Sequence, residues 1–358
     1  MPIATQTFTT AAATPQTGAG SLKLRGSHIQ PQTAAFENLD KNGVSLVALS
    51  RWSLCSCQFC VVPSVISSEK ADSYVQRAYE WLEGFGKGFK KDDRSTWKPE
   101  NLPGFYRGGL FNRHGAGHEQ FAWDIRSEQA VIDVFAKIWG TDELLVSFDG
   151  VNVSLPFDKA AAVDRSPWAH VDQSPNRRHK HCVQGIMNLY DNGPLDGGLM
   201  VLEGSFPLYN EFFQAHEHEA PEGGWKWMDS YHHTESQLQW FYDRGCTWKK
   251  IEANPGDVIL WDSRCIHYGA AAEGDRPRVA TYICYKPARD SSLEQDALRK
   301  KCIEHWDMTS HDPIVFRPTG SRVSEEAGSI PKGVDRLLPS KTPVLSHRAQ
   351  QLAGIVPY

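Results

Sequence analysis

The sequence predicts a mainly β fold with flanking helices. Helical patterns fall at residues 67–85 and 128–139, and from Leu144 to Tyr285 short apolar runs alternate with turn residues such as Gly, Asn and Pro. Helices followed by many short strands indicate a helical layer that supports a separate β-core. With 358 residues, the chain can bury a large core, as one elaborated domain or as two.

Residues 1–35 are expected to form a flexible tail, since the first twenty carry no charge and are mostly Thr, Ala, Gln and Gly. Residues 36–143 are expected to form a helical buttress, with a candidate strand at 44–49. The buttress also contains three closely spaced cysteines, Cys55, Cys57 and Cys60. They can bind zinc or an iron–sulfur cluster, but no second Cys pair at ligand spacing follows, so a local structural feature is favoured.

Two helices are predicted within this buttress. Ser67 or Ser68 can cap the first, and Gly140 ends the second after Trp139. Apolar residues recur at helical spacing in both, which gives each helix one face to bury. These residues are Ala71, Tyr74, Val75, Ala78 and Trp81 in the first helix, and Val131, Val134, Phe135 and Ile138 in the second.

Residues 144–290 are expected to form the β-core. The turn Pro255-Gly256-Asp257 feeds one of its strands, and alternation within a strand predicts which side chains share a face. The predicted strands are 144–155, 182–190, 199–202, 258–266 and 278–285. One face of the first strand would carry Val146, Phe148, Gly150, Asn152 and Ser154. One face of the fourth strand, continued to the next histidine, would carry Ile259, Trp261, Ser263, Cys265 and His267.

An insertion at residues 206–250, rich in Trp, His and acidic residues, interrupts the core. Helical pieces are predicted at 208–215 and 235–244. Long insertions between core strands commonly cover an active site, so we expect this one to act as a lid. Residues 291–358 are expected to form a C-terminal helix at 293–306 and a tail.

A candidate metal site is formed by His170, Asp172 and the distant His267. Residues two apart on an extended chain point to the same side, so His170 and Asp172 can hold one ion together. Two histidines and one carboxylate form a facial triad that leaves coordination positions open, as in non-haem Fe(II) oxygenases. The alternative is that these are ordinary core or surface groups, since the chain has 14 His.

An arginine follows the distal histidine and can hold a dicarboxylate by a bidentate pair. Two candidates lie two residues apart, Arg276 and Arg278. Strand alternation does not separate them, because both would point to the same face. Either can instead form a surface ion pair with Asp275 or Glu273, and such a pair would contribute little to the stability of the fold.

The order His170-x-Asp172, Pro255-Gly256-Asp257, His267 and Arg278 resembles the phytanoyl-CoA dioxygenase-like family of Fe(II)/2-oxoglutarate oxygenases. The resemblance is firmest over residues 145–287 and weaker from about residue 62. It implies a double-stranded β-helix core of the jelly-roll, cupin-like type, with Fe(II), 2-oxoglutarate and O2 as cofactors. The family's spacing favours Arg278 over Arg276 as the 2-oxoglutarate anchor.

The resemblance also implies the reaction, which is oxidation of a C–H bond of a small molecule with release of succinate and CO2. Hydroxylation, desaturation and cyclisation are all open outcomes. Similar sequences are frequent in fungal natural-product pathways, so a role in secondary metabolism is expected. Two alternatives stay open: a cupin-like iron oxygenase that does not use 2-oxoglutarate, and a non-catalytic small-molecule binding protein.

Further residues are weaker candidates, each weighed against plain packing or a solvated loop. Gln184 and Asn152 lie on predicted core strands and can hydrogen-bond the co-substrate. Trp168 can form a wall of the pocket. Two other sets can reach the substrate. One is His118, Gln120 and Arg126, near a Gly-rich loop, and the other is the basic run Arg177-Arg178-His179-Lys180-His181, which can attract an anion.

Composition limits the partners. The net charge is −5, which gives no reason to expect nucleic acid or an anionic membrane. No apolar run approaches the roughly 20 residues of a membrane-spanning helix, and neither a secretory signal nor a peroxisomal address is recognised. We therefore expect a cytoplasmic enzyme with reduced cysteines and a small-molecule substrate, and a homodimer as a possible assembly.

Overall fold

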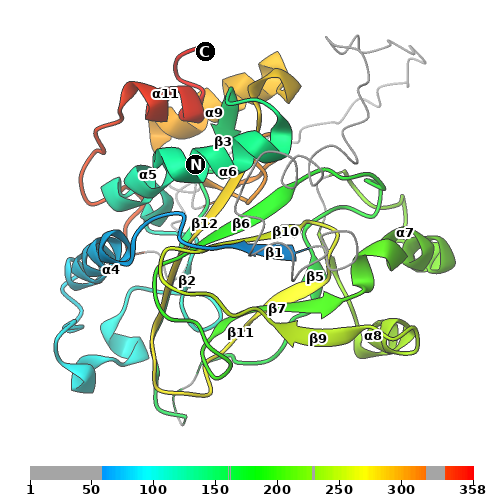
Figure 1. Ribbon diagram of the computed structural model, residues 1–358, viewed down its shortest axis with the longest axis horizontal. Coiled ribbons are helices and arrows are strands. Elements are labelled where there is room, and N and C mark those ends of the chain that lie inside the picture. Colours follow the sequence, from blue (N-terminus) through cyan, green and yellow to red (C-terminus); the bar gives the residue numbers. More distant parts are fainter. Residues whose placement is uncertain (1–58, 160, 162, 228–229, 320–334) are drawn as a thin grey trace, which may run out of the picture. The chain divides into compact units, whose positions relative to one another are not determined.

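The computed structural model describes residues 59–358 apart from 160, 162, 228–229 and 320–334 (Figure 1). The predicted tail at 1–35, the candidate strand at 44–49 and the cysteines Cys55 and Cys57 lie outside these residues. Cys60 is described and lies buried in strand β1 (Phe59–Val62), where burial raises the pKa of its thiol to about 12.

Two antiparallel sheets form the centre of the described part (Figure 1). The larger has seven strands, in the order β1-β10-β6-β12-β4-β2 with β3 also paired to β12, and the smaller has five, in the order β8-β5-β11-β7-β9. The larger sheet contains, besides β1, β2 (Leu110–Phe111), β3 (Leu144–Val146), β4 (Val151–Ser154), β6 (Val183–Asn188), β10 (Val258–Asp262) and β12 (Arg278–Pro287). The smaller contains β5 (His170–Val171), β7 (Gly198–Glu203), β8 (Tyr231–His232), β9 (Thr247–Lys250) and β11 (His267–Ala270).

The two sheets face each other across a small apolar core. Ile186 of β6 and Ala280 of β12, from the larger sheet, belong to one buried cluster with Val201 of β7, from the smaller sheet. Val201 lies directly opposite His267. The predicted double-stranded β-helix core is thereby confirmed, and its interior is lined by the strands that carry the candidate site.

Helices cover the outer face of the larger sheet (Figure 1). Phe135 and Tyr285 join this layer to β12 with ring centroids 4.6 Å apart, and the indole nitrogen of Trp139 donates to the carbonyl oxygen of Tyr285 at 2.7 Å. The layer contains α4 (Ser68–Glu83), α5 (Gln120–Arg126), α6 (Gln129–Trp139), α9 (Leu293–His305) and α11 (His347–Ala353).

The caps and buried faces of the first two predicted helices are confirmed. The Ser67 side chain accepts from the Lys70 amide at the start of α4, and Gly140 ends α6 with φ of 67°. All of the apolar positions predicted to face inward are buried. These helices are recognisable locally because capping and 3.6-residue periodicity agree.

The predicted strand at 144–155 is wrong in one respect, because a β-bulge divides it. Val146 pairs with Tyr285 and Val151 with Thr281, so four residues on one strand (147–150) face three on the other (282–284). The extra residue reverses the alternation. Val146 consequently faces the helices, whereas Asn152, opposite Ala280, faces the other sheet.

The predicted strand at 258–266 is also shorter than expected. It ends at Asp262, whose backbone carbonyl accepts from the Cys265 amide at 2.9 Å in a turn, and the chain then enters β11 of the other sheet. Trp261 and Cys265 nevertheless belong to the cluster between the sheets, and Trp261 contacts the His267 ring at 5.3 Å between centroids.

The insertion supplies two helices, α7 (Ser205–Ala215) and α8 (Glu235–Tyr242), in agreement with the prediction. A capping box at Thr234 and Gln237 begins α8. The insertion also supplies β8 and β9, which flank the smaller sheet, and β8 pairs with β5 at His170. Its apolar side chains form their own cluster around Phe212 and Phe213.

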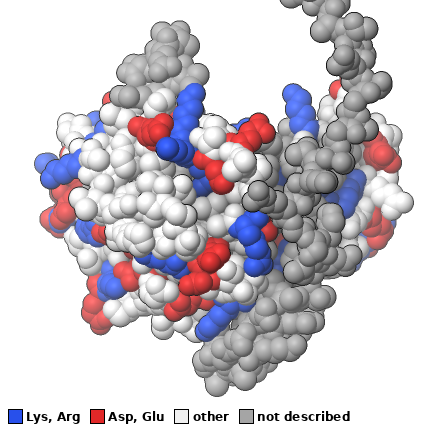
Figure 2. Space-filling model, turned by 90° about the horizontal axis from the view of Figure 1, so that it is seen from above, with Lys and Arg blue, Asp and Glu red and all other residues white. Residues whose placement is uncertain are grey.

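After α9 come β13 (Met308–Thr309) and β14 (Pro318–Thr319). None of the described helices is both long and apolar enough to cross a membrane. On the face of the molecule in Figure 2, Lys and Arg side chains are interspersed with Asp and Glu, in keeping with the small net charge of −5.

Candidate metal centre

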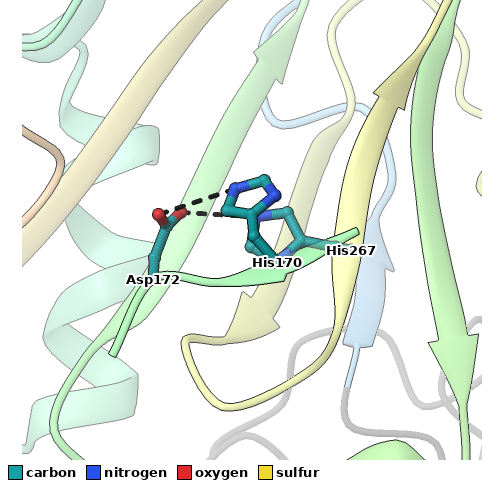
Figure 3. A group of neighbouring side chains, drawn as sticks. All are labelled: His170, Asp172 and His267. Atoms are coloured by element: carbon teal, nitrogen blue, oxygen red, sulfur yellow. Dashed lines mark ion pairs between the residues drawn. The ribbon is translucent and has the colours of Figure 1, made fainter. Parts of the chain in front are cut away.

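The three predicted metal ligands lie together between the sheets (Figure 3). His170 on β5 and His267 on β11 are directly paired, and Asp172 follows β5 by one residue. The Nε2 atoms of His170 and His267 lie 3.6 and 3.3 Å from the Asp172 carboxylate oxygens. One potential ligand atom from each residue lies within 4.8 Å of the others, close enough for all three to bind one ion.

Backbone carbonyls orient both imidazoles. The His170 Nδ1 lies 3.0 Å from the carbonyl oxygen of Trp168, and the His267 Nδ1 lies 2.9 Å from that of Cys265. Because a carbonyl oxygen only accepts, each Nδ1 carries the proton and each Nε2 lone pair is free for a metal. Burial, with the neighbouring His267, lowers the pKa of His170, which favours the neutral ligand form.

The Asp172 carboxylate is held by its surroundings. Burial alone would raise its pKa, but His311 and His170 outweigh burial and hold the pKa well below its usual value. Gln184 on β6 donates from Nε2 to Asp172 Oδ2 at 2.8 Å. An ionised carboxylate with two neutral imidazoles is the donor set expected for Fe(II), so the residues fit the ion that the sequence predicted.

Gln173, which the sequence analysis did not consider, fixes the loop that follows Asp172. Its side-chain amide donates to the carbonyl oxygens of Arg177 and His179, and its Oε1 accepts from the Ser263 hydroxyl at 2.7 Å. The contact joins the segment after β5 to the turn before β11. It therefore holds the two parts of the triad in register.

The structure separates the two candidate arginines. Arg276 is exposed and binds Asp196, with 2.6 Å between Nη2 and the carboxylate. Arg278, the first residue of β12, is only 5% exposed, its Nε has no hydrogen-bond partner, and among the described residues no carboxylate lies within ion-pair distance of it. A buried guanidinium without an anion is costly, so Arg278 suits a bound carboxylate.

A second cation lies near Arg278. Burial and the charge of Arg278 lower the pKa of Lys250 to about 8, and the Lys250 ammonium donates to Asn192 Oδ1 at 2.5 Å. Asn152 and Ser154 of β4 lie on the same inward face, with Ser154 opposite Arg278. The end of the barrel at Arg278 is thus positive and polar, which favours a dianion such as 2-oxoglutarate.

The remaining predicted residues divide into two groups. Trp168 lies at the site, stacked on His170 with 4.1 Å between ring centroids and an interplanar angle of 12°. His118 and Arg126 are instead fully buried in the helical layer, where they contact the backbone carbonyls of Asp307 and Asp149. Gln120 binds Asp124 and the backbone of Val344. These contacts give the last three a structural role.

His311 is a further residue at the site that the sequence analysis missed. Its Nδ1 lies 3.9 Å from Asp172 Oδ2. It is held there by Asp312, a buried carboxylate that contacts His181 at 2.5 Å and Lys286 at 3.3 Å. No local pattern marks His311, because its position depends on contacts with segments far away in the chain.

A small cavity opens beside Asp172. Arg177 and His311 contribute to its wall, together with Ser230, Ser310, Val315 and Arg317. The cavity thus lies between the loop after β5, the insertion and the C-terminal segment. None of these segments is a strand of the two main sheets, so their meeting at this point could not be read from strand patterns.

Comparison with known proteins identifies the family. The model of the phytanoyl-CoA dioxygenase (PhyH) family matches residues 59–280. The chain is 41% identical over 255 residues to Ava biosynthesis cluster protein O of Aspergillus versicolor, covering 71% of this chain and 82% of that one. It is 22% identical over 260 residues to a putative phytanoyl-CoA dioxygenase of Dictyostelium discoideum, covering 63% and 71%.

Among solved structures, the chain is similar to the non-heme alpha ketoglutarate dependent epimerase SnoN from nogalamycin biosynthesis. The identity is 14% and the TM-score 0.46, with 84% of this chain and 97% of that one covered. The family model covers more than half of the chain, and the 41% identical relative covers 71% of it. The chain therefore belongs to the phytanoyl-CoA dioxygenase family, and it is an oxygenase that depends on Fe(II), 2-oxoglutarate and O2.

Proposed function

We propose that His170, Asp172 and His267 are the ligands of the Fe(II) ion. The observation that carries this assignment is the commitment of both Nδ1 atoms to backbone carbonyls, which leaves the two Nε2 atoms beside one carboxylate. Gln184 and Gln173 position this set, Gln184 by its hydrogen bond to Asp172 and Gln173 by joining the loops that carry the ligands. All three ligands would approach from one side and leave the opposite side open.

Arg278 is proposed as the anchor for the distal carboxylate of 2-oxoglutarate. Its burial and its unpartnered Nε support this role, and the ion pair of Arg276 with Asp196 argues against the alternative. Lys250 adds positive charge, and Asn152 offers an amide on the same face. A cupin-like oxygenase without 2-oxoglutarate is disfavoured, because Arg278 would then be buried without an anion.

Bound Fe(II) with 2-oxoglutarate and O2 supplies the oxidising chemistry, which releases succinate and CO2 and oxidises a C–H bond of the substrate. The protein's own residues hold the co-substrate, orient the substrate and exclude water. Trp168 covers one face of the His170 ring and shields it. The family match disfavours a non-catalytic binding protein.

We further propose that the substrate is a small molecule of secondary metabolism, since one relative belongs to a biosynthesis cluster. Residues 206–250 would serve as the lid, because their strand β8 pairs with β5 at the metal site. The cytoplasmic location and a homodimer remain predictions, as does the absence of nucleic-acid and membrane partners.

The test is anaerobic titration of the purified protein with Fe(II) and 2-oxoglutarate, followed by measurement of succinate after O2 is admitted. We expect one Fe(II) and one 2-oxoglutarate per chain. His170→Ala should lose iron binding, whereas the matched control His218→Ala, at a side chain that is 74% exposed, should retain it. Iron binding by folded His170→Ala would refute the ligand assignment.

A further inference from the structure

The side chain of Arg177 is a buried cation that takes no part in the proposed metal and 2-oxoglutarate sites. Its exposed fraction is 3%. Its Nε and Nη1 are buried and have no hydrogen-bond partner. A guanidinium that loses its water without gaining an acceptor is destabilising, so such a group is expected to have a ligand.

Among the described residues, no carboxylate lies within ion-pair distance of Arg177. Burial lowers the pKa of this guanidinium, and Asp312 is the acidic group that most opposes the effect. However, the Asp312 carboxylate already contacts His181 and Lys286 and lies beyond ion-pair distance of Arg177. The guanidinium also lies over the Trp227 ring at 5.5 Å from its centroid, which satisfies no N–H group.

Arg177 lines the cavity beside Asp172. The rim of the same cavity carries the exposed Arg317, and its hydroxyl groups come from Ser230 and Ser310. Two guanidinium groups and two hydroxyls form a donor-rich wall. Asp172 is the one carboxylate among the described residues of this wall, and a bound metal would offset its charge.

We propose that this cavity binds an anionic group of the substrate, a carboxylate or a phosphate, through Arg177. The inference rests on the proposed function, since a substrate held there would lie next to the metal ligand Asp172. Arg177 would then be a specificity-determining residue that fixes which end of the substrate lies away from the iron. The fork of the guanidinium would bind the anion in a bidentate manner.

The loop that carries Arg177 is well fixed for this role. Gln173 binds its backbone at two carbonyl oxygens, and two further hydrogen bonds join it to the insertion. The Ser174 hydroxyl donates to the carbonyl oxygen of Lys226 at 2.7 Å, and the Asn176 side chain donates to that of Trp225. A cation on a rigid loop loses little entropy when it binds its ligand.

The test uses three probes that share a phenyl ring: phenylacetate, phenyl phosphate and phenylacetamide. Binding is measured by anaerobic isothermal titration calorimetry, once with Fe(II) and 2-oxoglutarate bound and once without either. We expect an anionic probe to bind at least about 10-fold more tightly than the amide, the effect of one charge-assisted hydrogen bond. The tighter of the two anions identifies the group as carboxylate or phosphate.

Arg177→Leu should abolish this preference, and Arg177→Lys should retain part of it. Arg178→Leu is the matched control, because Arg178 is the next residue and does not line the cavity; it should keep the full preference. Thermal melting confirms that each variant is folded. A preference that survives in folded Arg177→Leu would overturn the proposal.

Equal binding of all three probes by the wild-type protein would also overturn it, without any variant. The two proposals fail separately. If 2-oxoglutarate does not bind but the anion preference persists without metal, the proposed function fails and the cavity assignment stands. If 2-oxoglutarate binds and no anion preference exists, the cavity assignment fails and the proposed function stands.

Discussion

Replacing Arg278 tests how the protein holds its co-substrate. Arg278 is 5% exposed, and its Nε lacks a partner. In Arg278→Leu, the distal carboxylate of 2-oxoglutarate would lose a bidentate ion pair, and hydrogen bonds to charged groups contribute about 1.5–3 kcal/mol each. Two such bonds give at least about 3 kcal/mol, which corresponds to a 2-oxoglutarate Kd raised by about 100-fold or more.

The same substitution should leave the free energy of unfolding unchanged or raise it. It removes a buried charge whose Nε has no partner and which forms no ion pair with the described carboxylates. It also places an apolar side chain beside the core between the sheets. Arg278→Lys should be intermediate in 2-oxoglutarate affinity, because a lysine keeps the charge and loses the fork. A change in affinity without a change in stability would separate a binding role from a structural one.

The assay is anaerobic titration of the Fe(II)-loaded protein with 2-oxoglutarate, together with chemical denaturation of the metal-free protein. Arg276→Gln is the matched control, since its exposed guanidinium is already paired with Asp196 and is not free to hold the co-substrate. Its Kd should change by less than about 5-fold. An unchanged Kd in Arg278→Leu, with a large increase in Arg276→Gln, would refute the assignment.

Two further predictions concern the supports of the metal site. Gln184→Leu should weaken iron binding by about 10- to 100-fold, as expected when a partner of a ligating carboxylate is lost. Equilibrium dialysis against Fe(II) measures the iron affinity. An unchanged affinity would show that the hydrogen bond of Gln184 to Asp172 does not support iron binding. Asp312→Asn should destabilise the protein by about 3–5 kcal/mol at pH 7, because it leaves Lys286 buried without its carboxylate. Burial would raise the pKa of Asp312, but Lys286 and His181 hold the pKa well below its usual value. The stabilisation by the Asp312 carboxylate is therefore present above about pH 4. It is lost as the pH falls through the pKa of Asp312 in the folded state. Urea denaturation at pH 7 and at pH 3 checks both points, and a difference between wild type and variant that grows on acidification would contradict the account.

Local sequence was sufficient for the parts of the fold that are set locally. Ser67 caps a helix and Gly140 ends one because capping and left-handed backbone have strong residue preferences. The side chains of His170 and Asp172 lie on the same side of the chain, because side chains of an extended chain alternate with a period of two residues. These inferences required no knowledge of what packs against the segment.

The errors arose where a distant contact decides the structure. At the bulge at 147–150 the chain lies against a distant segment, since a Cβ on Gly150 would collide with the backbone of Phe111. The break after Asp262 follows from the change of sheet before His267. His311 reaches the site only because Asp312 is bound by β12 and by the loop before β6. The contacts of Gly150 with Phe111 and of Asp312 with His181 and Lys286 join residues that are far apart in the sequence.

The central claim is that one iron binds through the Nε2 atoms of His170 and His267 and the carboxylate of Asp172. Anomalous diffraction at the iron absorption edge, from crystals grown anaerobically with Fe(II) and 2-oxoglutarate, tests it most directly. The account predicts a single anomalous peak among these three side chains, with both Nδ1 atoms still at their backbone carbonyls. A peak elsewhere, or iron bound through an Nδ1 atom, would contradict it.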